Sequence, residues 1–136
     1  MGMYTEIVLG VTLKSYTPPA VIDLLRRAVD GKDEDGGVAG GRVLRPSGSA
    51  YFHSRPEISF VQDDEGSCWS LNVRNNIKDY SGDIKAFCQW IAPFVISDEM
   101  AGYCRTEDCP PTLIVFDDGK VKWIEVRCSP DVWSDA

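Results

Sequence analysis

Apolar and polar side chains alternate along two stretches of the chain. Within residues 4–13, every second position from Ile7 to Leu13 carries an aliphatic side chain, and this period is typical of a β-strand with one buried face. Residues 68–74 alternate in the same way, with Trp69 on the apolar side and Asn72 and Arg74 on the polar side. Both stretches predict strands that face a core on one side only.

Shorter patterns predict the remaining strands. Acidic turns that end in glycine, at 63–66 and 117–119, predict two hairpins. The stretch 112–116 has no polar face after its first residue, which is typical of a central strand. The further predicted strands are 50–53, 58–62, 101–105, 112–116 and 120–127.

Two segments have the 3.6-residue apolar period of a helix. The first follows Thr17, which we expect to cap it, with Pro18 in the first turn. The second runs over about 82–92, where we expect Ser81 to be the cap and Pro93 to prevent continuation. Each helix has one apolar stripe, so each is predicted to pack on a sheet.

The predicted order is β-α-β-β-β-α-β-β-β, which indicates an α+β fold. We expect a mostly antiparallel sheet of six or seven strands with two helices on one face. Residues 1–128 are expected to form a single domain, followed by an acidic tail over 129–136. Glycines and acids dominate 30–49, which predicts a flexible loop with a short strand around Val43 and Leu44.

A short sequence match hints at internal symmetry. The run from Leu13 to Thr17 and the run from Ile77 to Ser81 share the pattern apolar-Lys-x-Tyr-Ser/Thr, and a predicted helix follows each. The tyrosine of each run would pack over the turn between strand and helix. The match suggests a two-fold pseudo-repeat, although chance also explains so few shared residues.

Composition and charge exclude several classes of protein. The 136 residues are 43% hydrophobic and 26% charged, which is typical of a globular domain rather than a disordered chain. The net charge of −7 argues against direct binding to nucleic acid or to an anionic membrane. No apolar run is long enough to span a membrane, and the N-terminus lacks the regions of a signal peptide.

The cysteines point to a reducing compartment. There are five of them, an odd number without a CxxC pair, which does not fit a disulfide framework. A single histidine, His53, lies far from them in sequence. We therefore expect reduced thiols, a cytoplasmic protein, and neither a metal site nor a cofactor.

Three motifs suggest chemistry but lack what the chemistry needs. Gly36 and Gly41 have phosphate-loop spacing, yet the lysine, the hydroxyl residue and the flanking strand and helix are missing. The acidic run 30–35 lacks the alternation and the later glutamate of a calcium loop. His53 could act as a base for a cysteine only with partners that sequence does not reveal. We therefore assign no catalytic residue.

The sheet face opposite the helices offers a candidate binding surface. Side-chain parity predicts that Asn72, Arg74, Trp123, Glu125 and Arg127 lie on this outer face, with Ile124 and Val126 in the core. A tryptophan among polar and charged residues has the composition of a recognition patch. The alternative is that Trp123 packs under the glycine-rich loop or under the tail.

Several segments carry a resemblance to known proteins. They are the run from Met3 to Gly10, Tyr51-Phe52 with Pro56 nearby, the run from Trp69 to Tyr80, and the run from Trp90 to Phe94. Together they resemble a group of small, acidic, uncharacterised proteins of bacteria and their phages. The resemblance implies an intracellular setting and a role such as interference between phage and host, and it transfers no site residue.

These observations favour a non-enzymatic module that binds a protein through its outer sheet face. One alternative is an acidic mimic of nucleic acid, whose acids at 33–35, 63–65, 97–99 and 117–118 would converge at one end of the sheet. A second alternative is a small enzyme that uses a cysteine and His53. A homodimer is compatible with an exposed sheet face.

Overall fold

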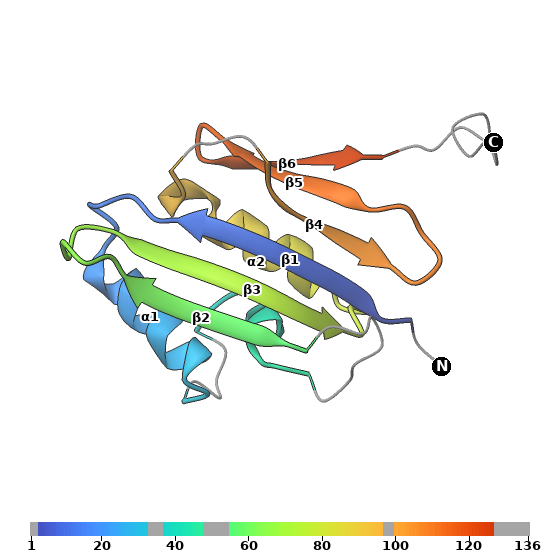
Figure 1. Cartoon of the computed structure of the whole chain (residues 1–136), viewed down its shortest axis with the longest axis horizontal. Coiled ribbons are helices and arrows are strands. Elements are labelled where there is room, and N and C mark those ends of the chain that lie inside the picture. The colour runs from blue at the N-terminus through green and yellow to red at the C-terminus, as the bar shows by residue number, and fades with distance from the viewer. Residues whose placement is uncertain (1–2, 33–36, 48–54, 97–99, 127–136) are drawn as a thin grey trace.

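The computed structural model describes residues 3–32, 37–47, 55–96 and 100–126 (Figure 1). Two α-helices, two short 3-10 helices and six strands follow one another along this part of the chain. The predicted strand over 50–53 lies outside the described residues. In order, the elements are β1 (Thr5–Thr12), α1 (Pro19–Val29), η1 (Gly41–Leu44), β2 (Glu57–Gln62), β3 (Trp69–Ile77), α2 (Asp83–Ile91), η2 (Ala92–Phe94), β4 (Met100–Thr106), β5 (Thr112–Asp117) and β6 (Lys120–Glu125).

The six strands form one open sheet in the order β2-β3-β1-β4-β5-β6. Every neighbouring pair is antiparallel, and β1 lies between β3 and β4 near the middle of the sheet. The predicted α+β fold with a mostly antiparallel sheet is therefore confirmed. The strand 112–116 is an interior strand, as its apolar sequence predicts.

The first four strands form two interlocked units. In one, α1 connects β1 to β2, and β3 lies between these two parallel strands. In the other, α2 connects β3 to β4, with β1 between them. This is the split β-α-β arrangement of ferredoxin-like domains, extended here by β5 and β6. The topology is compatible with a sequence repeat, which stays a prediction.

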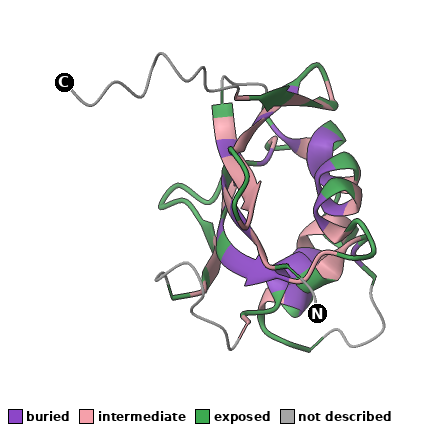
Figure 2. Cartoon of the chain, turned by 90° about the vertical axis from the view of Figure 1, so that its right-hand side faces the viewer, coloured by how far each residue is buried: buried purple, intermediate pink, exposed green. Residues whose placement is uncertain are grey.

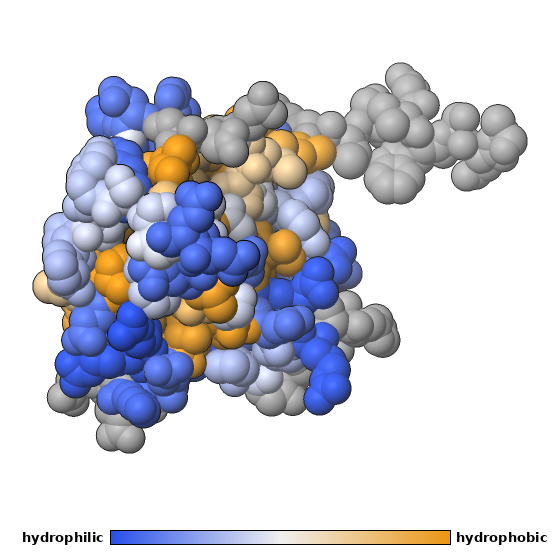
Figure 3. Space-filling model, turned by 60° about the vertical axis from the view of Figure 1, so that its left-hand side comes forward, coloured by the Kyte–Doolittle hydropathy of each residue, from blue (hydrophilic) through white to orange (hydrophobic). Residues whose placement is uncertain are grey.

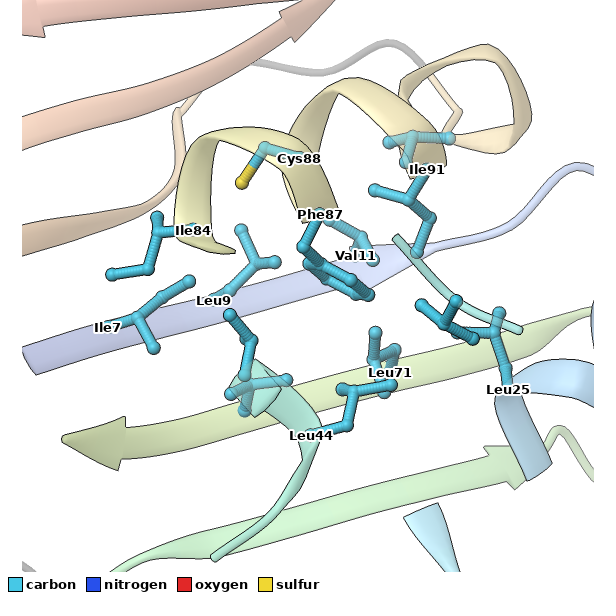
Figure 4. Close-up of a cluster of buried hydrophobic side chains, with 14 of the residues drawn as sticks. Ile7, Leu9, Val11, Leu25, Leu44, Leu71, Ile84, Phe87, Cys88 and Ile91 are labelled. Carbon is cyan, nitrogen blue, oxygen red and sulfur yellow. The ribbon is translucent and has the colours of Figure 1, made fainter. Parts of the chain in front are cut away.

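The helical elements that the structure describes all lie on one face of the sheet (Figures 1 and 2). The core fills the space between the two layers. Figure 4 shows Ile7 and Leu9 of β1 pointing toward Phe87 of α2, with Leu25 of α1 and Leu44 of η1 beside them. Alternate residues of β1 and β3 supply the sheet side of this core, as the period-two pattern predicts.

The turns between strand and helix differ from the predicted ones. Thr17 does not cap α1, since its hydroxyl donates to the carbonyl oxygen of Lys14 at 2.6 Å and so closes the preceding turn. The first backbone N–H of α2 is bound by the carboxylate of Asp79, not by Ser81. Tyr16 and Tyr80 are 76% and 68% exposed, so neither packs over its turn.

The glycine-rich stretch is the largest departure from the sequence prediction. Residues 37–47 of this stretch pack against the core, and Val43 and Leu44 are fully buried in a 3-10 helix instead of a short strand. Gly40 allows this close approach, because a Cβ there would lie 2.1 Å from the carbonyl oxygen of Asp83 in α2. Its φ of +64° also favours glycine. The glycines therefore permit tight packing.

Asn75 of β3 fastens this stretch to the sheet. It is 1% exposed on the helix side. Its amide nitrogen donates to the carbonyl oxygens of Val43 at 3.0 Å and Arg45 at 2.7 Å. Its amide oxygen accepts from the backbone N–H groups of Ser47 and Asn76 at 3.0 and 2.9 Å. A polar residue inside the core is thus matched by four hydrogen bonds.

Candidate functional site

One face of the sheet carries none of the described helical elements, and the strand register shows how its side chains are arranged. Residues that face each other on neighbouring strands form a row that crosses the whole sheet. The row runs, from β2 to β6, through Glu57, Arg74, Val8, Tyr103, Leu113 and Ile124. Its first two members are charged and its last four are apolar or aromatic.

The apolar part of this row, its last four members, is the most distinctive feature of the face. Together with Val115, which lies two residues beyond Leu113 on β5, its members make a continuous patch over four strands. We call Val8, Tyr103, Leu113, Val115 and Ile124 the apolar band. Ile124 is 48% exposed and the other four are half-buried. The band therefore presents side-chain surface that another molecule could bury.

Charged groups border the band at the end where β1 begins. Glu6 is only 4% exposed although it points away from the helices. Its carboxylate accepts a hydrogen bond from Nε of Arg105 at 2.9 Å and a long one from the hydroxyl of Tyr103 at 3.4 Å. Glu6 and Arg105 therefore give the band a polar border beside Val8 and Tyr103.

A shallow polar hollow lies on the same face beside the band. It has a volume of about 510 Å³ and lies over β1, β2 and β3. Gly10 lacks a side chain at this point, and the side chain of Asn72 lies over it, since a Cβ on Gly10 would meet Asn72 Oδ1 at 3.2 Å. Arg74 and Glu57 line the hollow as well. The two predicted binding residues of β3 thus flank the apolar band.

The other predicted binding residues do not join them. Trp123 and Glu125 of β6 pair with Ile114 and Thr112, so they lie on the helix side of the sheet. Trp123 packs against the core, while Ile124 lies on the outer face, the reverse of the prediction. Each side of this edge strand carries both apolar and polar residues. The sequence pattern therefore did not decide which side faces the core. Arg127 lies outside the described residues.

A second hollow opens where β1 and β4 part. Their pairing ends at Leu9 and Gly102, and beyond it lies a hollow of about 260 Å³. Figure 3, turned toward this end of the sheet, shows hydrophobic patches in orange between hydrophilic side chains in blue. None of the described residues that line the hollow is titratable, so it offers apolar contact without acid-base chemistry. The lining residues are Gly10, Val11, Thr12, Val95, Ile96, Met100, Ala101 and Phe116.

The remaining sequence motifs yield no site in the described part of the chain. Gly41 begins a 3-10 helix rather than an α-helix, so the phosphate-loop spacing lacks the helix that binds phosphate. His53 and residues 33–35 of the acidic run lie outside the described residues. Over the residues that are described, no cluster of His, Cys, Asp or Glu could hold a metal ion. None of the described helices is both long and apolar enough to cross a membrane.

The described cysteines are free thiols, and two of them are poor nucleophiles. Burial raises the pKa of Cys88 to about 12, with a smaller contribution from Cys104. Burial also raises the pKa of Cys104 to about 11, with a smaller contribution from Asp79. Because the thiolate is the reactive form, these two side chains resist attack on a substrate near neutral pH.

We expect alkylation near neutral pH to separate these thiols by at least about a hundredfold in rate, with exposed Cys109 fast and Cys88 and Cys104 slow. Peptide mass spectrometry after timed iodoacetamide treatment measures the rates.

The raised pKa values also mean that ionisation favours the unfolded chain once the pH exceeds about 9. Stability should therefore fall between about pH 9 and 12. Fast labelling of Cys88 in the folded protein would contradict the burial and the raised pKa on which both predictions rest.

The acidic turns bear on the proposed mimic of nucleic acid. The β2–β3 turn at 63–66 and the β5–β6 turn at 117–119 lie at the same end of the sheet (Figure 1). However, seven of the 21 acidic residues lie outside the described part of the chain. The described residues contain 14 acidic and 13 basic side chains, so this part of the molecule is almost neutral.

The chain matches no family model, no curated protein and no solved structure. The resemblance to small acidic proteins of bacteria and phages therefore stays a prediction. Because a fold of this class supports many unrelated functions, the geometry of the outer sheet face is the best guide to function.

Proposed function

We propose that this protein is a non-enzymatic module that binds a protein partner through its outer sheet face. One observation carries the proposal: Val8, Tyr103, Leu113 and Ile124 stand side by side across four strands on the face without helices. Antiparallel sheets often leave one face to solvent, but that face is then usually polar. An apolar row in this place is typical of a contact surface.

The surroundings of the apolar band support this role. Tyr103 and Arg74 are of the residue types that are enriched at protein interfaces, where a buried apolar centre is surrounded by polar groups. Asn72, Arg74 and Glu57 supply such polar groups on the β2 and β3 side. Arg105 and Glu6 supply them at the end of the band. The face thus has both parts of a docking surface.

The alternatives have less support. A cysteine enzyme would have to use a thiol other than Cys88 or Cys104, because burial keeps those two protonated. A mimic of nucleic acid needs a row of carboxylates on one surface, and the described surface has nearly equal numbers of both signs. The salt dependence of partner binding distinguishes the mimic from the proposed docking module, since binding by a mimic would weaken strongly as ionic strength rises.

The setting is part of the same proposal. We place the protein in a reducing cytoplasm, where it would interfere with a host or phage process. The free thiols of the described cysteines support the compartment. The sequence resemblance supports this kind of process.

Replacing Leu113 by glutamate should weaken retention of the partner about tenfold or more, because it puts a charge in the middle of the apolar band. The measurement is capture of a discrete partner by the immobilised protein, quantified against protein concentration. Gln89→Glu is the matched control, since it adds the same charge at an exposed position of α2 on the opposite side. Equal retention by wild type and Leu113→Glu would refute the docking face.

A further inference from the structure

We infer that the partner of the outer face is a second copy of this chain, which packs on it sheet against sheet around a two-fold axis. This inference rests on the proposed docking function and names the occupant of the same surface. Three features of the face argue for it: its area, its charge and the position of the apolar band.

The area of the face suits a dimer. Six strands about 4.8 Å apart, each about 20 Å long, give a flat projection of roughly 580 Å². Side-chain relief raises the accessible area above this value, toward the roughly 800 Å² that each partner buries in a standard interface. A short peptide would cover only part of such a surface, whereas another twisted sheet can cover most of it.

The charges of the face are balanced internally. Arg105 pairs with Glu6 at 2.9 Å, and Lys122 pairs with Asp117 at 2.9 Å. Glu57 faces Arg74 across neighbouring strands. Two copies of this face therefore meet without an excess of like charge, although each whole chain carries a net charge of −7. A strongly basic or strongly acidic partner finds no matching field here.

The position of the apolar band fits two-fold symmetry. The band runs from β1 to β6, so its centre lies near Tyr103 on β4 and Leu113 on β5. A two-fold axis that lies midway between the two sheets, parallel to both, and passes over this point places the band of one copy on the band of the other, as an isologous interface requires. Asn72 and Arg74 then lie toward the border of the contact, where polar side chains remain hydrated.

The test is the mass of the purified full chain in solution, measured by light scattering and sedimentation over a range of concentrations. Wild type should approach twice 15.1 kDa as concentration rises. Leu113→Glu should raise the dissociation constant by about tenfold or more, and Gln89→Glu should leave it unchanged. Ile124→Glu, at a 48% exposed position, provides a second disruptive variant with little risk to folding. Circular dichroism checks whether each variant is folded.

The outcomes separate this inference from the proposed function. A wild-type chain that stays monomeric, yet retains another protein in a manner sensitive to Leu113→Glu, overturns the dimer and keeps the docking face. A dimer that survives both Leu113→Glu and Ile124→Glu places its interface elsewhere, which also overturns the inference. If neither self-association nor partner retention responds to these variants, the proposed function fails as well.

Discussion

Replacing Gly102 by alanine is expected to lower the free energy of unfolding by about 3 kcal/mol or more, a large fraction of the total stability of a typical domain. Gly102 lies on β4 opposite Leu9, on the side that faces the core. A Cβ at this position would lie 1.9 Å from the carbonyl oxygen of Val8. Backbone cannot move aside as a side-chain tip can, so β1 and β4 would have to separate.

Chemical denaturation monitored by circular dichroism measures this loss. The matched control is Gly41→Ala, because its added methyl group would lie 3.8 Å from the Cβ of Val38, an ordinary van der Waals contact. We expect that variant to stay within about 1 kcal/mol of wild type. Equal stability of Gly102→Ala and wild type would show that the close approach of β1 and β4 is wrong.

Truncating Asn75 to alanine is expected to lower the free energy of unfolding by about 3 kcal/mol. The change removes both donors that reach Val43 and Arg45, and it leaves a buried carbonyl oxygen without its amide partner. It also removes the acceptor for the backbone N–H of Ser47. The segment around η1 would then lose its attachment to β3 while keeping its apolar contacts.

Asn72→Ala is the matched control for Asn75→Ala. Asn72 lies on the same strand but is exposed on the outer face, so its truncation should cost less than about 0.5 kcal/mol. Hydrogen exchange gives a second readout, because the backbone amide protons of Val43, Leu44, Arg45 and Ser47 should exchange faster only in Asn75→Ala. If both truncations cost the same, Asn75 does not fasten the segment.

The fold could be predicted from the sequence where one face of an element is clearly apolar. The alternation in β1 and β3 and the apolar stripes of α1 and α2 each leave a single way to bury the side chains. The acidic turns between strands fixed the hairpins. These local patterns sufficed for the α+β class and for helices on one face.

The candidate site was harder to predict because it depends on register across the sheet. Val8, Tyr103, Leu113 and Ile124 come from four separate segments, and only the pairing of strands brings them into one row. On β6 the pattern allowed two parities, and the wrong one exchanged Trp123 with Ile124. The larger apolar area of a tryptophan favours the core, which was a usable signal.

The glycine-rich stretch was misjudged for a different reason. Glycines suggest freedom of the backbone, but here Gly40 lies against α2 where a side chain would not fit. The buried Asn75 that holds the stretch lies about 30 residues away, on β3. A polar residue at a position that alternation assigns to the core was the one available sign of such an attachment.

The central position of β1 has a consequence for synthesis of the protein. Glu6 faces Asn76 on one neighbouring strand and Arg105 on the other, so β1 finds its partners only after most of the chain has left the ribosome. Until then the nascent chain carries an unpaired strand with an apolar side, which is a substrate for chaperones and a risk for aggregation. Because β1 lies in the middle of the sheet, the sheet as a whole folds slowly and late.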